Sequence, residues 1–290
     1  MKLATSAAST CSSRTRRPAS LPEGHTLHRL ASELTDTFGG RVVSSSSPQG
    51  RFGVGASRLD GRVLERAEAW GKHLLVDFAG LRERVHVHLG IYGSFVVAAA
   101  DQPVVGQVRW RLATGTATAD LRGPTVCELL EPDDADALID RIGPDPLRAD
   151  ADPDQAWQRI SSSRAPIATL LMDQRVMSGV GNVYRAEVLF RHRVDPDLAG
   201  HELDRETFAA MWADLMTLMR TGVQTGRIDT VDAEHEPEAM GRDPRVDDHG
   251  GEVYVYRRDG QACLVCGATV CTRVHAGRNL FWCPSCQHRR

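Results

Sequence analysis

Apolar and polar positions change their period once along the chain. In the first half, the apolar spacing over 27–34 fits a short helix, after which apolar and polar residues alternate as they do in half-buried β-strands. The segments compatible with strands are 72–79, 84–98, 105–112 and 116–130. Several strands at short spacing predict an antiparallel sandwich or barrel. His86 and His88 share one face of a predicted strand, and we expect them to face solvent.

A proline-rich stretch, 143–154, predicts a linker, and beyond it the period becomes helical. Residues 206–222 place large apolar side chains at helical spacing, which is typical of a helix packed into a core. The segment 226–250 contains eight acidic residues against three arginines. We interpret this segment as an acidic, solvated connector to the last 40 residues.

Composition narrows the class of protein. With 41% apolar and 25% charged residues the chain is globular, and no apolar run approaches the length of a membrane span. A net charge of −3 excludes a uniformly basic surface, so a nucleic-acid site has to be a local patch. Arginine replaces lysine almost everywhere, and Lys72 is the only lysine beyond Lys2. Because lysine releases a proton more readily than arginine, Lys72 is a candidate for proton transfer; chance retention on a solvated strand is the alternative.

Two CxxC pairs near the end of the chain carry the strongest local signal. Sixteen residues separate the pair Cys263 and Cys266 from the pair Cys283 and Cys286, a spacing that lets four thiolates bind one Zn²⁺. Four sulfur ligands leave no position for a reactive water, so we expect the zinc to be structural. Cys271 is surplus to such a site. Unligated core cysteines or a redox pair are the alternative. A local basic patch surrounds the pairs, formed by Arg273, Arg278, Arg289 and Arg290.

A glycine-rich turn precedes a second candidate site. Within 177–190 one helical segment ends and another begins near Asn182. Free backbone N–H groups at a helix start, together with the Asn182 amide, predict an anion site suited to a DNA phosphate. Simple packing of two helices is the alternative for this motif.

These motifs occur in the order found in one enzyme family. They are PEG at 22–24, WGKHLL at 70–75, HLGIYG at 88–93, a helix-two-turns-helix at 165–190, and GRNLFWCPSCQ at 277–287. Together they resemble the Fpg/Nei family of DNA glycosylases, and they are most similar to its actinobacterial endonuclease VIII (Nei-type) members. The resemblance extends from Pro22 to about Gln287.

The resemblance implies an α+β multidomain fold. Its parts are an N-terminal antiparallel β-sandwich, a central helix-two-turns-helix domain and a C-terminal four-cysteine zinc finger. We expect these at 22–145, 152–225 and 252–290, with the acidic connector at 226–251. Residues 1–21 are expected to be a disordered extension that is absent from the mature protein.

The resemblance also implies a bifunctional glycosylase and AP lyase of base excision repair. Pro22 resembles the N-terminal proline whose amine attacks C1′ of the damaged nucleoside and forms a Schiff base. Glu23 matches the acid that protonates the sugar ring oxygen. Lys72 matches the lysine that contacts phosphate and donates a proton in β-elimination. Arg278 matches the finger arginine that grips flanking phosphates and assists δ-elimination.

Other positions are similar to DNA-binding residues of the family. Asn182 corresponds to its phosphate-binding asparagine, Ile91 and Tyr92 to the loop that fills the gap left by the flipped nucleotide, and Arg122 to a minor-groove arginine. The implied partner is double-stranded DNA with damaged bases or abasic sites. We expect one structural zinc, no membrane, a monomer, and a cytoplasmic, nucleoid-associated protein.

The chain departs from the family pattern in two places. His25 and Thr26 stand where the family starts PELPE or PEGPE, so the second acidic residue is missing. PEG in place of PEL favours oxidised pyrimidines; preference for 8-oxoguanine or formamidopyrimidine is the alternative. Pro22 also follows other residues here, which would make its nitrogen an amide. Leu21 fits a start codon read as Met and removed, so we expect the mature chain to begin at Pro22. If residues 1–21 are retained, a non-catalytic module that binds damaged DNA is favoured; a zinc scaffold for protein partners is the weakest alternative.

Overall fold

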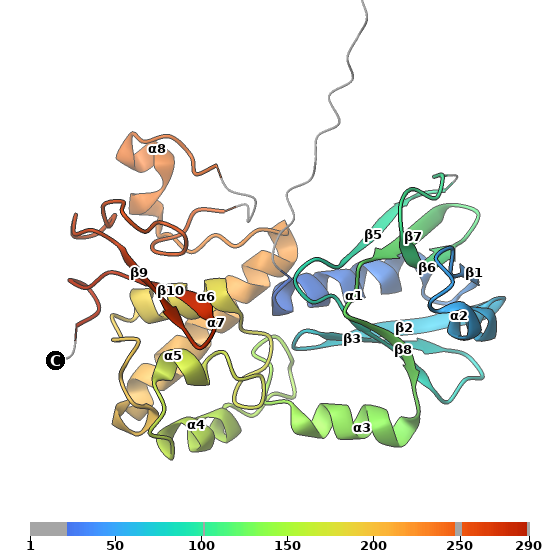
Figure 1. The fold of residues 1–290 in the computed structure, drawn as a ribbon, viewed down its shortest axis with the longest axis horizontal. Coiled ribbons are helices and arrows are strands. Elements are labelled where there is room, and N and C mark those ends of the chain that lie inside the picture. Colours follow the sequence, from blue (N-terminus) through green and yellow to red (C-terminus); the bar gives the residue numbers. More distant parts are fainter. Residues whose placement is uncertain (1–21, 101, 247–250, 289–290) are drawn as a thin grey trace, which may run out of the picture.

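A computed structural model describes residues 22–100, 102–246 and 251–288. The expectations for residues 1–21 and for Arg289 and Arg290 therefore lie outside the described residues. The described chain forms a β-rich part and a helical part that carries the finger hairpin, with α1 and α7 meeting between them (Figure 1). None of the described helices is both long and apolar enough to cross a membrane.

The β-rich part is antiparallel throughout. Its helices are α1 (Gly24–Phe38), α2 (Gly53–Leu59) and α3 (Pro132–Arg141). Its strands are β1 (Arg41–Ser46), β2 (Arg62–Trp70), β3 (His73–Phe78), β4 (Arg84–His88), β5 (Ser94–Ala99), β6 (Val108–Ala113), β7 (Ala117–Arg122) and β8 (Val126–Leu130). The strand order is β5-β7-β6-β1-β2-β3-β4-β8.

Strand β1 lets this sheet fold into two facing layers. Its first half pairs with β2 and its second half with β6, so it belongs to both layers. Trp110 on β6 is fully buried and contacts Phe78 on β3, with ring centroids 6.3 Å apart. The alternating apolar side chains meet between the layers, which confirms the predicted β-sandwich.

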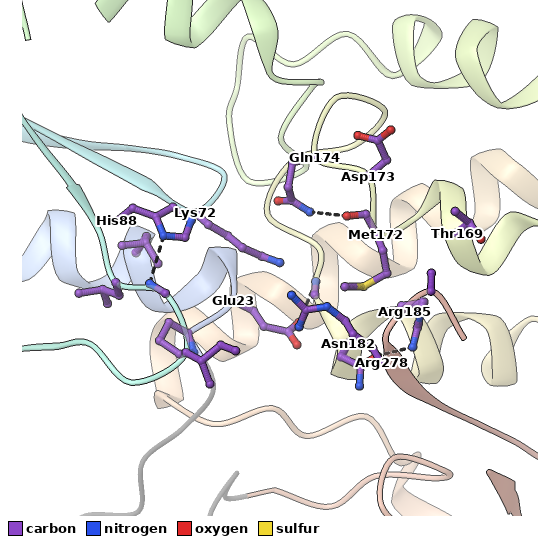
Figure 2. Close-up of a pocket in the computed structure, with 17 residues that line it drawn as sticks. Glu23, Lys72, His88, Thr169, Met172, Asp173, Gln174, Asn182, Arg185 and Arg278 are labelled. Carbon is purple, nitrogen blue, oxygen red and sulfur yellow. Dashed lines mark hydrogen bonds between the residues drawn. The ribbon is translucent and has the colours of Figure 1, made fainter. Parts of the chain in front are cut away.

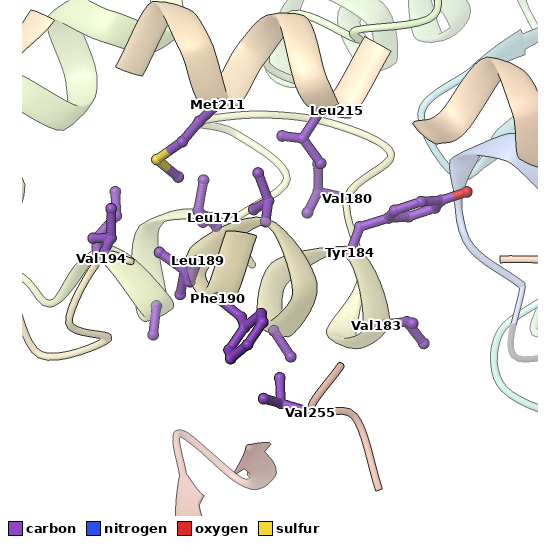
Figure 3. Close-up of a cluster of buried hydrophobic side chains, with 14 of the residues drawn as sticks. Leu171, Val180, Val183, Tyr184, Leu189, Phe190, Val194, Met211, Leu215 and Val255 are labelled. Carbon is purple, nitrogen blue, oxygen red and sulfur yellow. The ribbon is translucent and has the colours of Figure 1, made fainter. Parts of the chain in front are cut away.

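The helical part surrounds one central helix. It comprises α4 (Pro153–Ser161), α5 (Ile167–Leu170), α6 (Asn182–Arg191), α7 (Arg205–Thr225) and α8 (Pro237–Met240), with short 3₁₀ turns at Gly200–Glu202 and Ala233–His235. Eight consecutive residues of α6, from Val183 to Phe190, are buried. Residues from α7 and from the segment before the finger pack around α6, among them Met211, Leu215 and Val255 (Figure 3). The finger hairpin consists of β9 (Cys271–His275) and β10 (Arg278–Trp282).

Two local expectations are wrong. His86 is only 5% exposed, because Glu128 on β8 and His73 on β3 flank it and hydrogen-bond to its two ring nitrogens at 3.1 and 2.9 Å. The connector is not wholly solvated either: Ile228 and Thr230 are buried. Its acidic residues are compatible with packing because they pair with arginines, for example Asp232 with Arg191 at 3.0 Å.

Candidate functional site

A cavity of about 420 Å³ opens where the two parts and the finger meet. Its lining includes Pro22 and Glu23 at the start of α1, Lys72 in the β2–β3 turn, Asn182 on α6 and Arg278 on β10. Figure 2 shows Lys72 and Arg278 directed toward the region around Glu23. Four residues named as catalytic from the resemblance therefore share one cavity although their positions span 22–278.

Glu23 links the start of α1 to the start of α6. Its carboxylate is 2% exposed and accepts backbone N–H groups from Gly181 at 3.0 Å, Val183 at 2.8 Å and Tyr184 at 3.4 Å. Burial raises the pKa of Glu23, against the opposing effects of Lys72 and of these three N–H groups. The N–H groups at this helix start do bind an anion, as predicted, but in the free protein that anion is the Glu23 carboxylate.

Lys72 reaches from the β2–β3 turn to the segment just before α6. Its Nζ donates a hydrogen bond to the carbonyl of Val180 at 2.8 Å. Burial lowers the pKa of Lys72 to about 8; Glu23 opposes this shift and Arg278 adds to it. A lysine with this pKa can donate or accept a proton near neutrality.

Pro22 lies between this cavity and a second one. The second cavity, of about 430 Å³, is lined by Pro22, by His25 and Thr26, and by the loop residues Ile91 and Tyr92. The two residues that depart from the family pattern therefore face the same space as Pro22.

The loop after β4 presents apolar surface to solvent. Ile91 is 51% exposed and Tyr92 is 89% exposed. Exposed apolar side chains at the mouth of a cavity are suited to contact a partner rather than the core. Arg122 is placed differently: its guanidinium pairs with Asp120 at 2.7 Å and donates to the carbonyl of Val105 at 3.1 Å. Arg122 is not among the described residues that line either cavity.

Asn182 connects α6 to the finger. Its Nδ2 donates to the carbonyl of Asn279 at 3.1 Å, and Arg185 donates to the same carbonyl at 3.1 Å. Arg185 also donates to the Asn182 side-chain oxygen. These bonds fix the residue next to Arg278, whose own side chain is exposed at the cavity.

Several residues that line the cavity were not predicted as site residues, among them Arg185 and His88. Arg185 is 1% exposed, and burial lowers its pKa to about 10. His88 lines the cavity and accepts the Gly90 N–H at Nδ1, at 3.1 Å, so its other ring nitrogen carries the proton when the ring is neutral. Nothing in local spacing distinguishes Arg185 from other helix-surface arginines. The alternation in β4 did identify His88 as a polar position, but it predicted that the side chain faces solvent and not the cavity.

The four paired cysteines form a metal site. The sulfur atoms of Cys263, Cys266, Cys283 and Cys286 all lie within 4.8 Å of one another. Four converging thiolates fit tetrahedral Zn²⁺, and a saturated set makes the zinc structural. Cys271 lies outside the cluster, and its Sγ contacts the Thr269 carbonyl at 3.7 Å. The chain therefore holds one structural zinc.

Comparisons with known proteins agree with this arrangement. Residues 21–126 match the formamidopyrimidine-DNA glycosylase N-terminal domain, 142–233 match its H2TH domain, and 260–289 match the zinc finger found in FPG and IleRS.

Relatives match over nearly the whole chain. The chain is 50% identical over 276 residues to "Endonuclease 8 1" of Mycobacterium tuberculosis, covering 92% of this chain and 100% of that protein. It is 31% identical over 280 residues to "Probable endonuclease 8 2" of Streptomyces coelicolor, covering 92% and 94%.

Among solved structures, the fold is similar to Lactococcus lactis Fpg in complex with DNA containing an abasic site. The TM-score is 0.75 at 21% identity, covering 92% of this chain and 100% of that one. With the four-cysteine cluster, the sandwich and the helical domain in place, these matches establish that the chain belongs to the Fpg/Nei family of DNA repair glycosylases.

Proposed function

We propose that the protein is a bifunctional DNA glycosylase and AP lyase that removes oxidised bases from double-stranded DNA. The observation that carries this proposal is the convergence of Pro22, the buried acid Glu23 and the partly buried amine Lys72 on one cavity. A secondary amine, an acid and a second amine are the groups that base expulsion and elimination require.

The first step uses Pro22 as the nucleophile. Its nitrogen attacks C1′ of a flipped nucleotide; the bond to the base breaks, the base leaves with the electron pair and a proton, and an iminium remains on Pro22. Glu23 protonates the sugar ring oxygen as the ring opens. Burial, which raises the pKa of Glu23, favours the protonated form that this step needs.

The second stage is elimination. The iminium acts as an electron sink, so loss of a C2′ proton expels the 3′ phosphate, and a further elimination expels the 5′ phosphate. Lys72 supplies a proton in β-elimination, which its pKa of about 8 permits at neutral pH. Arg278, exposed at the cavity, binds the flanking phosphate and assists δ-elimination.

DNA binding is expected around the cavity, where Arg278 is exposed and Asn182 keeps one Nδ2–H beyond its bond to Asn279. Arg278 and Asn182 contribute to the phosphate face, while Ile91 and Tyr92 fill the space left by the flipped nucleotide. Arg122 contacts the minor groove in this proposal only by exchanging its bond to Asp120 for one to DNA. The protein acts as a monomer on damaged or abasic duplexes.

Covalent catalysis requires a free amine on Pro22. An amide nitrogen is neither basic nor nucleophilic, whereas a free α-amine has a pKa of about 8. We therefore propose that residues 1–21 are absent from the active form. Intact-mass analysis of the purified native protein tests this, because a retained extension in an enzyme that still forms the adduct would exclude Pro22.

The substrates proposed are oxidised pyrimidines. The support for this preference is the resemblance of the start, PEG at 22–24 in place of PEL, to family members that act on oxidised pyrimidines. Thymine glycol should be cut faster than 8-oxoguanine opposite C. The reverse order would favour the alternative preference for oxidised purines.

Borohydride reduction with an abasic-site oligonucleotide tests the chemistry. A chain that starts at Pro22 should form a covalent adduct. In that chain, Pro22→Gly tests the attack by the amine, and Glu23→Gln tests the protonation that opens the sugar ring. The 290-residue chain is the matched control with a blocked nitrogen. If the chain starting at Pro22 binds abasic DNA but forms no adduct, the protein is a binding module.

A further inference from the structure

One carboxylate in the linker between the two parts is buried and fully engaged. Asp145 is 3% exposed, and its Oδ2 accepts the Gly71 N–H at 2.7 Å and the His28 Nε2–H at 2.7 Å. Its Oδ1 accepts the Leu147 N–H at 2.9 Å. A single side chain thereby joins the β2–β3 turn, helix α1 and the linker, since carboxylate bonds of this length are strong.

The turn that Asp145 holds is also seated on the helical part. Gly71 has φ +59°, and a Cβ there would lie 2.7 Å from the Ser178 Cβ and 2.9 Å from the Gly179 nitrogen. Only glycine fits such a contact, so the turn and the segment 178–180 lie directly against each other. Gly24 makes a similar approach on the α1 side, where its N–H donates to the Gly179 carbonyl at 2.8 Å.

Lys72 follows Gly71 and is therefore held at both ends. Asp145 fixes the backbone before it, and the Val180 carbonyl fixes its Nζ at 2.8 Å. Loss of the Asp145 bond would remove one of the contacts that hold the turn and leave its packing against 178–180. The bond from Nζ to Val180 is the only hydrogen bond described for the Lys72 side chain. Asp145 itself is not among the described residues that line the cavity.

We propose that Asp145 is a positioning residue that sets the Lys72 amine for the elimination step. This inference rests on the proposed function, because it assigns to Asp145 a role that operates through Lys72. Asp154 at the end of the same linker offers a matched control: it is exposed, and the described partner of its side chain is Arg205 on α7.

The test measures single-turnover cleavage of preformed abasic-site DNA by chains that start at Pro22. Asp145→Asn should lower the cleavage rate about 10- to 100-fold, as expected when a supporting hydrogen bond is removed from a reactive group. The apparent Kd for the DNA should stay within about threefold of the wild-type value, because the exposed phosphate-binding group Arg278 is unchanged. Asp154→Asn should leave both the cleavage rate and the apparent Kd within about twofold of wild type.

A double-mutant cycle separates positioning from general damage. In a Lys72→Ala background, Asp145→Asn should slow the residual cleavage by less than about twofold, because the group that it positions is already gone. An equal loss in both backgrounds would overturn the inference. Should Asp145→Asn fail to fold by circular dichroism, Asp145→Glu replaces it in the same cycle, since it keeps the charge but displaces the carboxylate by one methylene.

The outcome is distinguishable from failure of the proposed function. Wild-type chain that starts at Pro22 and forms no borohydride adduct would overturn the function itself, and the role of Asp145 with it. Wild-type chain that forms the adduct, combined with unchanged cleavage by Asp145→Asn, would overturn only the positioning role.

Discussion

Glu187 lies in the interior of the helical part and offers a sharp test of how the finger is seated. It is fully buried on α6 and accepts four hydrogen bonds. Oε2 accepts the Thr230 hydroxyl at 2.6 Å and the Tyr254 N–H at 2.7 Å. Oε1 accepts the Val255 N–H at 2.9 Å and the Tyr256 N–H at 2.8 Å. The segment that leads into the finger is therefore tied to α6 by this side chain.

Glu187→Gln keeps the shape but replaces one oxygen by an NH2 group. The less costly orientation places the NH2 group against the Thr230 hydroxyl, whose oxygen can accept, and against the Tyr254 N–H, so one hydrogen bond is lost and the other three no longer involve a charged acceptor. At about 1.5–3 kcal/mol for the lost bond and about 1 kcal/mol for each of the three weakened bonds, the loss is about 4–6 kcal/mol. Removal of a buried charge recovers about 2 kcal/mol of this, which leaves a net destabilisation of about 2–4 kcal/mol.

Thermal unfolding followed by circular dichroism, together with urea titration, measures this loss. For a chain of this size, each kcal/mol lowers Tm by about 2–4 °C, so we expect a fall of about 10 °C. Glu206→Gln on the exposed first turn of α7 is the control and should cost less than about 1 kcal/mol. A fall below about 1 kcal/mol for Glu187→Gln would refute the assignment of four strong bonds to this carboxylate.

Other expected outcomes concern the site. The part of abasic-site cleavage that depends on Lys72 should decrease as pH rises through about 8, because the ammonium donor is then lost; a pH profile of wild type minus Lys72→Ala measures it. Cys283→Ser should remove zinc and abolish tight DNA binding while the β-sandwich stays folded, as metal analysis and circular dichroism would report; normal zinc content would reject the assignment of four cysteine ligands. Ile91→Ala with Tyr92→Ala should slow cleavage of duplex but spare single-stranded DNA, because stacking of about 1–3 kcal/mol per base is lost; equal loss on both substrates would reject the gap-filling role.

Features with a short repeat could be predicted from the sequence. The two-residue period locates β3 and β6 to within a few residues, and helical spacing locates α7. The predicted segment 84–98 merges β4 and β5, which a turn separates. The cysteine spacing identifies all four members of the metal cluster, since the ligand geometry of Zn²⁺ restricts which separations can close. These signals depend on neighbours along the chain, so a linear pattern contains them.

Contacts between segments that are distant in the sequence produce no such local pattern, so they could not be predicted. The bonds from Glu23 to α6 span about 160 positions, and the bond from Lys72 to Val180 spans 108. Asp145 and Glu187 were not singled out, because an acidic residue in a linker or on a helix usually faces water. His86 was assigned to solvent for the same reason. Only the packing of two strands or two domains reveals which polar groups are buried with partners.

At the start of α6, three of the backbone N–H groups in the predicted anion site bind a carboxylate of the chain itself. Free N–H groups at a helix start do attract negative charge, and Glu23 supplies it from within the chain. A tethered carboxylate is present at far higher local concentration than any DNA phosphate, so it occupies the site first. On the proposed function, phosphates are then held by side chains such as Arg278 rather than by the α6 dipole. DNA affinity then depends on the position of the finger, which carries Arg278. Because Glu187 and Asn182 hold the finger and its preceding segment against α6, we expect their hydrogen bonds to affect activity at the cavity.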